Sequence, residues 1–150
     1  MDAPLYNAEI LRLAASIPAL QRLPHPAASA TRSSPVCGSR VRVELEVDAD
    51  GRVSAFAQEV RACALGQASA AILGQAVMGQ TAPALRAAHA ALAAWLRGPG
   101  AFPDFLADGF PLLRLFEPAR AHPARHPSIC LAFDAAAAAA EEASRPDPRA

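Results

Sequence analysis

The stretch "VRVELEVDADGRVSAFAQEVRAC", residues 41–63, decides the fold of this 150-residue chain. Its first seven residues alternate strictly between apolar and charged side chains, which is typical of a strand with one buried face. The segment 48–52 carries an Asp-Gly pair that favours a tight turn, and a less regular alternation follows in residues 53–63. We therefore predict a β-hairpin in which Val41, Val43, Leu45 and Val47 form the buried face of the first strand.

Helical patterns surround this hairpin on both sides. We predict helices over residues 5–17, 65–79, 81–98 and 128–144, a short helix near 112–116 within an irregular stretch 99–127, and a short edge strand around 28–32 in the Pro- and Ser-rich segment 23–39. Thr81 and Ser128 are the expected N-caps of the helices that they precede or begin. Gly79 and Gly98 are the expected helix ends.

Two or three strands with helices around them predict an α+β fold, a small antiparallel sheet covered on one face by helices. A chain of this length is expected to form one domain, here residues 1–145, and the tail 146–150 is expected to be disordered.

Composition narrows the classes of partner. Lys+Arg and Asp+Glu both number 14, so the formal net charge is zero and no basic field exists for nucleic acid or anionic lipid. The sequence has no uncharged apolar run long enough for a membrane span. Asp2 and Glu9 stand where a secretory signal carries basic residues. We therefore expect a cytoplasmic protein that binds neither nucleic acid nor membranes. Without a nucleophile elbow or a phosphate loop, hydrolysis is not indicated.

The three cysteines carry the most informative chemistry. An odd number in a reducing compartment argues against disulfides. Cys37 precedes the first strand of the hairpin and Cys63 ends the second, so antiparallel pairing places both at the same end of the sheet. Metal binding, sulfur chemistry and burial as small apolar side chains are the open alternatives. Two thiols alone seldom hold zinc or an iron–sulfur cluster, since these usually take four ligands.

Several motifs, taken in order, resemble those of the NifU/IscU/SufU family of iron–sulfur cluster assembly scaffolds over about residues 5–143. They are "LYNAEIL" (5–11), "PVCGSRVRVELEVDADGRV" (35–53), "ACALGQASAAI" (62–72), "GQT" (79–81) and "PARHPSICLAFDAA" (123–136). The long insertion between Gly79 and Pro123 is similar to the SufU type. The resemblance implies a small antiparallel sheet covered by helices, with the metal site at one end of the sheet.

The resemblance also implies a function. Family members hold iron, a nascent [2Fe–2S] cluster or zinc on three cysteines and an aspartate, and they receive sulfur from a cysteine desulfurase. We therefore predict a scaffold or sulfur acceptor rather than an enzyme, with recipient apo iron–sulfur proteins as further partners. Cys37 and Cys63 are the expected ligands, and Cys63 is the expected persulfide acceptor. The alternative is a non-catalytic zinc- or partner-binding module that kept the fold and lost cluster assembly.

Two family ligand positions are changed in this chain. The family Cys-Gly-Asp motif is Cys37-Gly38-Ser39 here, and alignment of "LAFDAA" places Ser128 where the third cysteine belongs. Cys130 lies two residues later, which on a helix turns the side chain by about 200° and away from the site. We expect Cys130 in the core and Ser128 nearest the two thiols. The additional candidate ligands are Ser39, Ser128, His126 and Cys130, and a solvent-facing ring is the default for His126.

Overall fold

The hairpin is the centre of a three-stranded antiparallel sheet in the computed structural model, which describes residues 5–17, 22–35 and 38–145. The strands follow in the order β1 (Ala28–Ser33), β2 (Arg40–Val47) and β3 (Val53–Arg61). Asp48 N–H donates to the carbonyl of Arg52 across the turn (2.8 Å). Gly51 has φ +78°, a conformation that favours glycine. The predicted hairpin and edge strand are confirmed.

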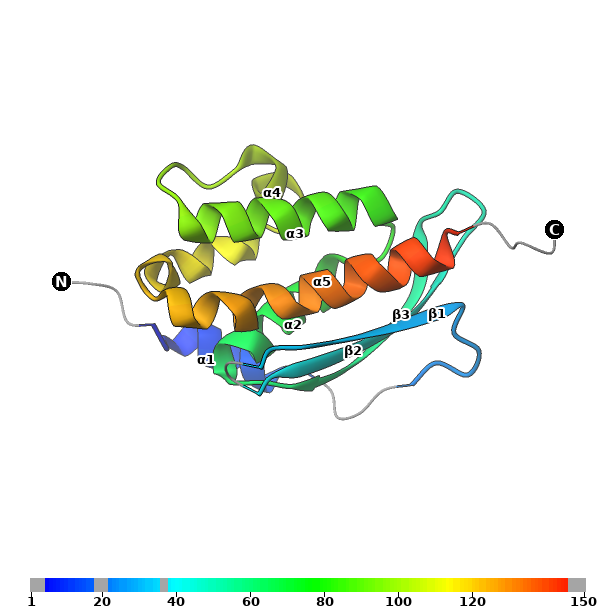
Figure 1. Cartoon of the computed structure of the whole chain (residues 1–150), viewed down its shortest axis with the longest axis horizontal. Helices are drawn as coiled ribbons and strands as arrows, with labels where there is room; N and C mark the ends of the chain where they lie inside the picture. Colours follow the sequence, from blue (N-terminus) through cyan, green and yellow to red (C-terminus); the bar gives the residue numbers. More distant parts are fainter. Residues whose placement is uncertain (1–4, 18–21, 36–37, 146–150) are drawn as a thin grey trace.

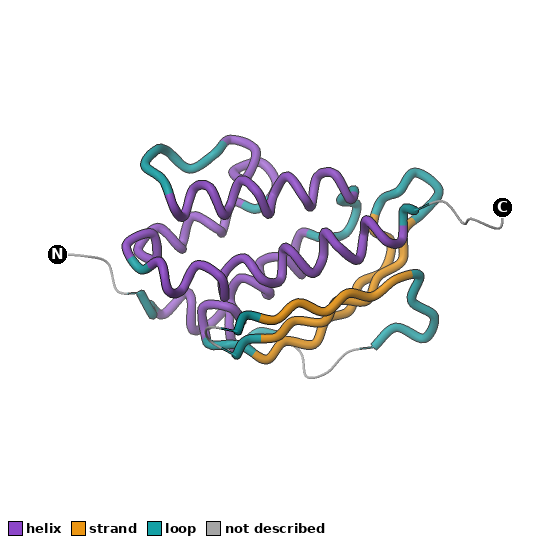
Figure 2. Tube along the Cα trace, in the orientation of Figure 1, coloured by secondary structure: helices purple, strands orange, loops and turns teal. Residues whose placement is uncertain are grey.

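Helices cover one face of this sheet (Figures 1 and 2). They are α1 (Ala8–Ala15), α2 (Ala64–Ala76), α3 (Ala82–Arg97), α4 (Asp104–Gly109) and α5 (His126–Ala143), joined by the 3-10 helices η1 (Pro111–Ala121) and η2 (Pro123–Arg125). Helix α5 packs on β1 and β2 and on α2, α1 packs on α2, and α3 packs on α5 on the side away from the sheet (Figure 1). The predicted α+β arrangement is therefore observed.

The core lies between the sheet and α5 and continues among α2, α3, α4 and η1. Val41, Val43 and Leu45 of β2 are fully or almost fully buried, as their alternation predicts, whereas Val47 is only partly buried. The buried face of α5 is largely alanine, at positions 132, 135, 136, 137, 139 and 140. Because alanine side chains are short, α5 can lie close to both the sheet and α3. Among the residues that the structure describes, no helix is long and apolar enough to cross a membrane.

The helix boundaries correct several sequence expectations. Helix α1 begins at Ala8, because the Asn7 side chain accepts the Ile10 N–H and caps the helix there (2.9 Å). Helix α2 ends at Ala76 with Val77 as C-cap, and Gly79 lies in the following turn at φ +84°. Thr81 and Gly98 cap α3 as predicted.

The stretch 99–127 is more helical than the predicted single short helix. Three of its prolines stand at helix starts, since Pro103 is the N-cap residue of α4 and Pro111 and Pro123 are the first residues of η1 and η2, whereas Pro118 lies inside η1. Proline is tolerated at a helix start because the first N–H groups of a helix have no partner within it. The tail 146–150 lies outside the described residues.

Candidate thiol site

Cys63 lies at the start of α2, at one end of the sheet. Strand β3 stops at Arg61, so the predicted strand is two residues too long, and Cys63 is the N-cap residue of α2 with an extended backbone (φ −66°, ψ 171°). Cys63 is half-buried and packs in part against the core. The free N–H groups at a helix N-terminus favour negative charge nearby, which suits an anionic sulfur at this position.

Two buried hydroxyl groups stand behind this sulfur. Ser128 Oγ of α5 lies 3.2 Å from Cys63 Sγ and 3.3 Å from Ser39 Oγ. Both serines are only 2% exposed. The three side chains thus form a continuous polar chain, Ser39–Ser128–Cys63, that joins the start of β2 to α5 and α2. Hydrogen bonds of this kind orient a thiol and can stabilise its anion.

The position of Ser128 corrects the expectation that it caps the last helix. Helix α5 begins at His126, with Arg125 as N-cap residue and Pro127 in the first turn, so Ser128 lies inside the helix. Its hydroxyl turns outward to α2 and β2. The placement beside Cys63 is the one expected from the family alignment.

Gly66 makes room for this arrangement, and the sequence reasoning missed it. A Cβ at Gly66 would lie 2.6 Å from Ser128 Oγ and 2.7 Å from Ala62 Cβ, both closer than real contacts allow. One helical turn later, the Ser69 hydroxyl donates to the Ile129 carbonyl of α5 (2.6 Å). Small residues three apart on α2 were the available sign of a close approach between two helices.

Cys37 lies outside the described residues, but the chain that follows it is placed. Ser34 N–H donates to the Ser39 carbonyl and Gly38 N–H to the Ser34 carbonyl, both at 2.8 Å. Gly38 has φ +71°, which favours glycine at this position. The described residues on either side of this gap, Ser34 and Ser39, are therefore hydrogen-bonded to each other at the site end of the sheet.

The other two candidate ligands lie apart from the polar chain. Cys130 is half-buried against the hydrophobic core, and desolvation raises the pKa of its thiol to about 12. His126 is buried rather than solvent-facing as expected, because its Nε2 hydrogen-bonds the Ala119 carbonyl of η1 (2.9 Å). A carbonyl only accepts, so Nε2 carries the proton and is not available to a metal. Within the described residues, no three His, Cys, Asp or Glu side chains gather as a metal site.

Comparison with known proteins identifies relatives of this fold. Residues 18–101 match a family model described as NifU-like N terminal domain. The crystal structure of a nitrogen-fixing NifU-like protein (N-terminal) from Brucella abortus is 43% identical, with a TM-score of 0.80 over 92% of this chain and 93% of that chain. No curated protein matches the chain.

A second solved structure shares the fold at low identity. It is a putative iron–sulfur cluster assembly scaffold protein for the SUF system from Fervidobacterium islandicum AW-1, with a TM-score of 0.78, 15% identity, and coverage of 91% of this chain and 96% of that chain. At this identity the likeness concerns the fold alone.

Proposed function

Because the chain belongs to the family of NifU-like N-terminal domains, we propose that it acts in iron–sulfur cluster assembly, as a scaffold or sulfur acceptor supplied by a cysteine desulfurase. The observation that carries this proposal is the half-buried Cys63 at the end of the sheet, whose sulfur contacts the Ser39–Ser128 hydroxyl pair. The protein acts as a carrier rather than an enzyme, and it passes its cargo to apo iron–sulfur proteins in the cytoplasm.

Sulfur acceptance needs one cysteine that a partner can reach, and the half-buried Cys63 is the candidate. The Cys63 thiolate attacks the outer sulfur of a persulfide on the desulfurase, and the sulfur–sulfur bond of that persulfide breaks. The desulfurase keeps its cysteine as a thiolate, and Cys63 becomes a persulfide, so charge and electrons balance. The hydroxyl of Ser128 stands 3.2 Å from Cys63 Sγ and can donate to the anionic sulfur before the attack.

Iron or a [2Fe–2S] cluster is the cargo that the family assembles. Cys37 and Cys63 are the thiolate ligands proposed here, with Ser39 and Ser128 in the positions of the remaining family ligands. Neutral hydroxyls bind soft metals poorly, so a cluster on this site is held by fewer strong ligands than in the family pattern. We therefore assign sulfur acceptance to Cys63 as the main step and cluster binding as transient.

Anaerobic incubation with a cysteine desulfurase, cysteine and ferrous iron tests this function. We expect one added sulfur atom on Cys63 by mass spectrometry, and visible charge-transfer absorption once iron and an electron donor that reduces the persulfide sulfur to sulfide are also present. Cys63→Ser should abolish both signals, while the matched control Cys130→Ser should leave them unchanged. Wild-type protein that stays colourless and takes up no sulfur would contradict the proposal.

The substitution of two family ligands by Ser39 and Ser128 favours one second candidate, a zinc- or partner-binding module that has lost cluster assembly. Metal analysis of the purified protein separates the two. Zinc that survives dialysis and blocks sulfur transfer to Cys63 supports the module. Sulfur transfer to a zinc-free protein supports the acceptor.

A further inference from the structure

An arginine-lined groove of about 250 Å³ opens on the sheet face away from the helices. Its walls are Arg22, Arg40, Arg42, Glu59 and Arg61. Because side chains alternate along a strand and Val41 and Val43 point into the core, the arginines at 40 and 42 point to the opposite face.

The groove adjoins the candidate thiol site. Arg40 and Arg61 are paired across β2 and β3 at the end of the sheet. Arg40 follows Ser39 directly, and Arg61 lies two residues before Cys63. The groove therefore reaches the same end of the sheet as Cys63.

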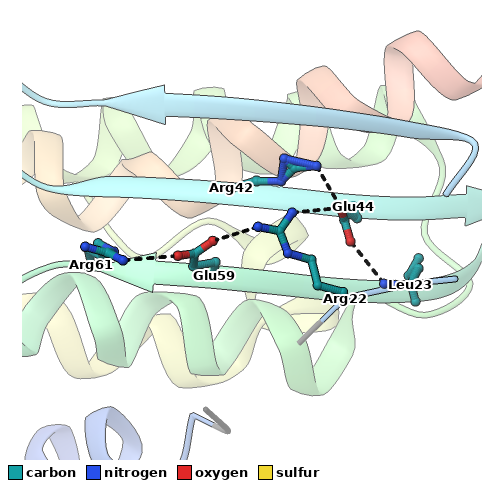
Figure 3. Close-up of polar contacts among 6 residues, drawn as sticks. All are labelled: Arg22, Leu23, Arg42, Glu44, Glu59 and Arg61. Atoms are coloured by element: carbon teal, nitrogen blue, oxygen red, sulfur yellow. Dashed lines mark hydrogen bonds and ion pairs between the residues drawn. The ribbon is translucent and has the colours of Figure 1, made fainter. Parts of the chain in front are cut away.

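Ion pairs connect most of the groove across the two strands (Figure 3). Arg61 pairs with Glu59 (3.5 Å), Glu59 with Arg22 (3.5 Å), Arg22 with Glu44 (3.3 Å) and Glu44 with Arg42 (2.7 Å). These distances show that the two glutamates are already shared among three arginines, so the network leaves an excess of positive charge.

Glu44 is the buried member of this network and stays ionised. Burial by itself raises the pKa of its carboxyl, but the Leu23 N–H (3.0 Å) and the guanidinium groups of Arg22 and Arg42 outweigh burial and lower the pKa. The carboxylate therefore holds two guanidinium groups in place on the sheet face.

Three arginines of the groove, Arg40, Arg42 and Arg61, are arranged unfavourably in the protein without a partner. Arg40 and Arg61 stand directly opposite each other, and like charges in that position destabilise a sheet. Arg40 forms no ion pair with any residue that the structure describes, and the Arg61 side chain is 78% exposed. The buried Nε of Arg42 has no hydrogen-bond partner among the described residues. Local arrangements that cost stability are expected where function uses them.

We propose that this groove is the docking site for an acidic segment of the protein that delivers sulfur to Cys63. The inference rests on the proposed function and assigns the surface that its partner uses. Arginine pairs with carboxylates through two parallel hydrogen bonds. Asp or Glu side chains of the partner would therefore accept from the guanidinium groups of Arg40 and Arg61 and reduce the repulsion between these two like charges. The docked partner then stands over the thiol end of the sheet.

Binding of a pyridoxal-phosphate cysteine desulfurase from the same organism tests the proposal. We would measure its Kd by fluorescence anisotropy at low and high salt for the wild type and for Arg40→Glu/Arg61→Glu. The matched control is Arg52→Glu/Arg145→Glu, which changes the net charge equally at the far turn of the hairpin and after the last helix. Because charge complementarity mainly speeds association, we expect the groove variant to weaken binding at low salt on the order of tenfold and to lose the salt dependence.

The remaining outcomes separate the two proposals. Sulfur transfer and binding that are equal in the groove variant and the wild type would overturn the groove while leaving the proposed function intact. No binding or sulfur transfer by the wild type would overturn the proposed function and, with it, the partner assigned to the groove. A neutral variant, Arg40→Gln/Arg61→Gln, checks folding by thermal unfolding and should weaken binding in the same direction. The proposal would also be overturned if the groove were a site for small anions. Inorganic phosphate would then raise the thermal midpoint of the wild type but not of the groove variant, and the groove substitutions would leave desulfurase binding unchanged.

Discussion

Replacing Ser128 by cysteine places a thiol where the motif resemblance puts the third cysteine of the family. Ser128 Oγ is 3.2 Å from Cys63 Sγ. Two sulfurs that share a tetrahedral metal with bonds of about 2.3 Å stand ~3.8 Å apart. The new sulfur therefore needs to move by less than an ångström, into space that Gly66 keeps free of a Cβ.

The expected increase in zinc affinity follows from the binding free energy that one thiolate ligand contributes. Structural zinc sites with four ligands bind with about 10–16 kcal/mol at neutral pH, so one added thiolate contributes roughly 3 kcal/mol. We expect Ser128→Cys to tighten zinc binding about a hundredfold, which is the equivalent of that free energy. The same change should retain a [2Fe–2S] cluster for longer after reconstitution.

Competition with a chromophoric zinc chelator measures this affinity, and cobalt substitution reports the number of thiolates through the visible charge-transfer bands. Ser128→Ala is the matched control and should not tighten binding. Cys130→Ala should leave the affinity unchanged and cost about 1 kcal/mol of stability, as a modest core truncation does. If Ser128→Cys has no effect and Cys130→Ala abolishes binding, Cys130 is the ligand and the assigned register is wrong.

Three further predictions follow from burial, packing and charge. Gly66→Ala should lower the free energy of unfolding by up to about 2 kcal/mol in urea titrations, because overpacking against Ser128 costs about 1–3 kcal/mol and the gain in helix propensity returns only ~1 kcal/mol. A rise of about 1 kcal/mol would contradict this. Iodoacetamide at pH 8 should label Cys63 much faster than Cys130, because the raised pKa of the Cys130 thiol, about 12, leaves almost no thiolate. Peptide mapping gives the order of labelling, and equal rates would refute the assigned burial of Cys130. Glu44→Gln should cost about 1 kcal/mol of stability at pH 7 and less at acid pH. The folded state lowers the pKa of the Glu44 carboxyl, so its ionised form stabilises the fold above the unfolded pKa of about 4.5, and this contribution is lost as the pH falls through the folded pKa. If denaturant titrations at pH 3 show the same cost, packing and not charge is responsible.

The sheet was predictable because its signal is local. The alternation from Val41 to Val47 fixes which face of β2 is buried, and the Asp-Gly turn fixes the register with β3. Thr81 was recognisable as a cap because a cap acts on its own helix: its side chain accepts the N–H of Ala84, only three residues on (3.3 Å). The helices within residues 99–127 were not recognisable, because a proline in a sequence is taken as a helix breaker although it can also stand at a helix start.

The site was less predictable because its contacts join distant segments. Ser128 has the residue type of an N-cap, and only the packing of α5 on α2 shows that its hydroxyl meets Cys63, 65 residues away. His126 between prolines resembles a surface residue until η1 brings the Ala119 carbonyl to its ring. Glu44 belongs to the polar side of an alternating strand, yet it is only 5% exposed, because Arg22 and Leu23 cross that side of the sheet.

These contacts explain why the family fold persists in a chain with altered ligands. A cysteine and a serine occupy similar space, so Ser128 keeps the close packing of α5 against Gly66 while it changes the chemistry offered to a metal. The aspartate position is likewise filled by Ser39, whose hydroxyl meets that of Ser128 in a buried hydrogen bond (3.3 Å). A buried carboxylate without a metal or a cation beside it is costly, whereas a pair of hydroxyls satisfies itself. The two hydroxyl groups thus satisfy each other without a metal, in keeping with the proposed role of Cys63 in taking up sulfur.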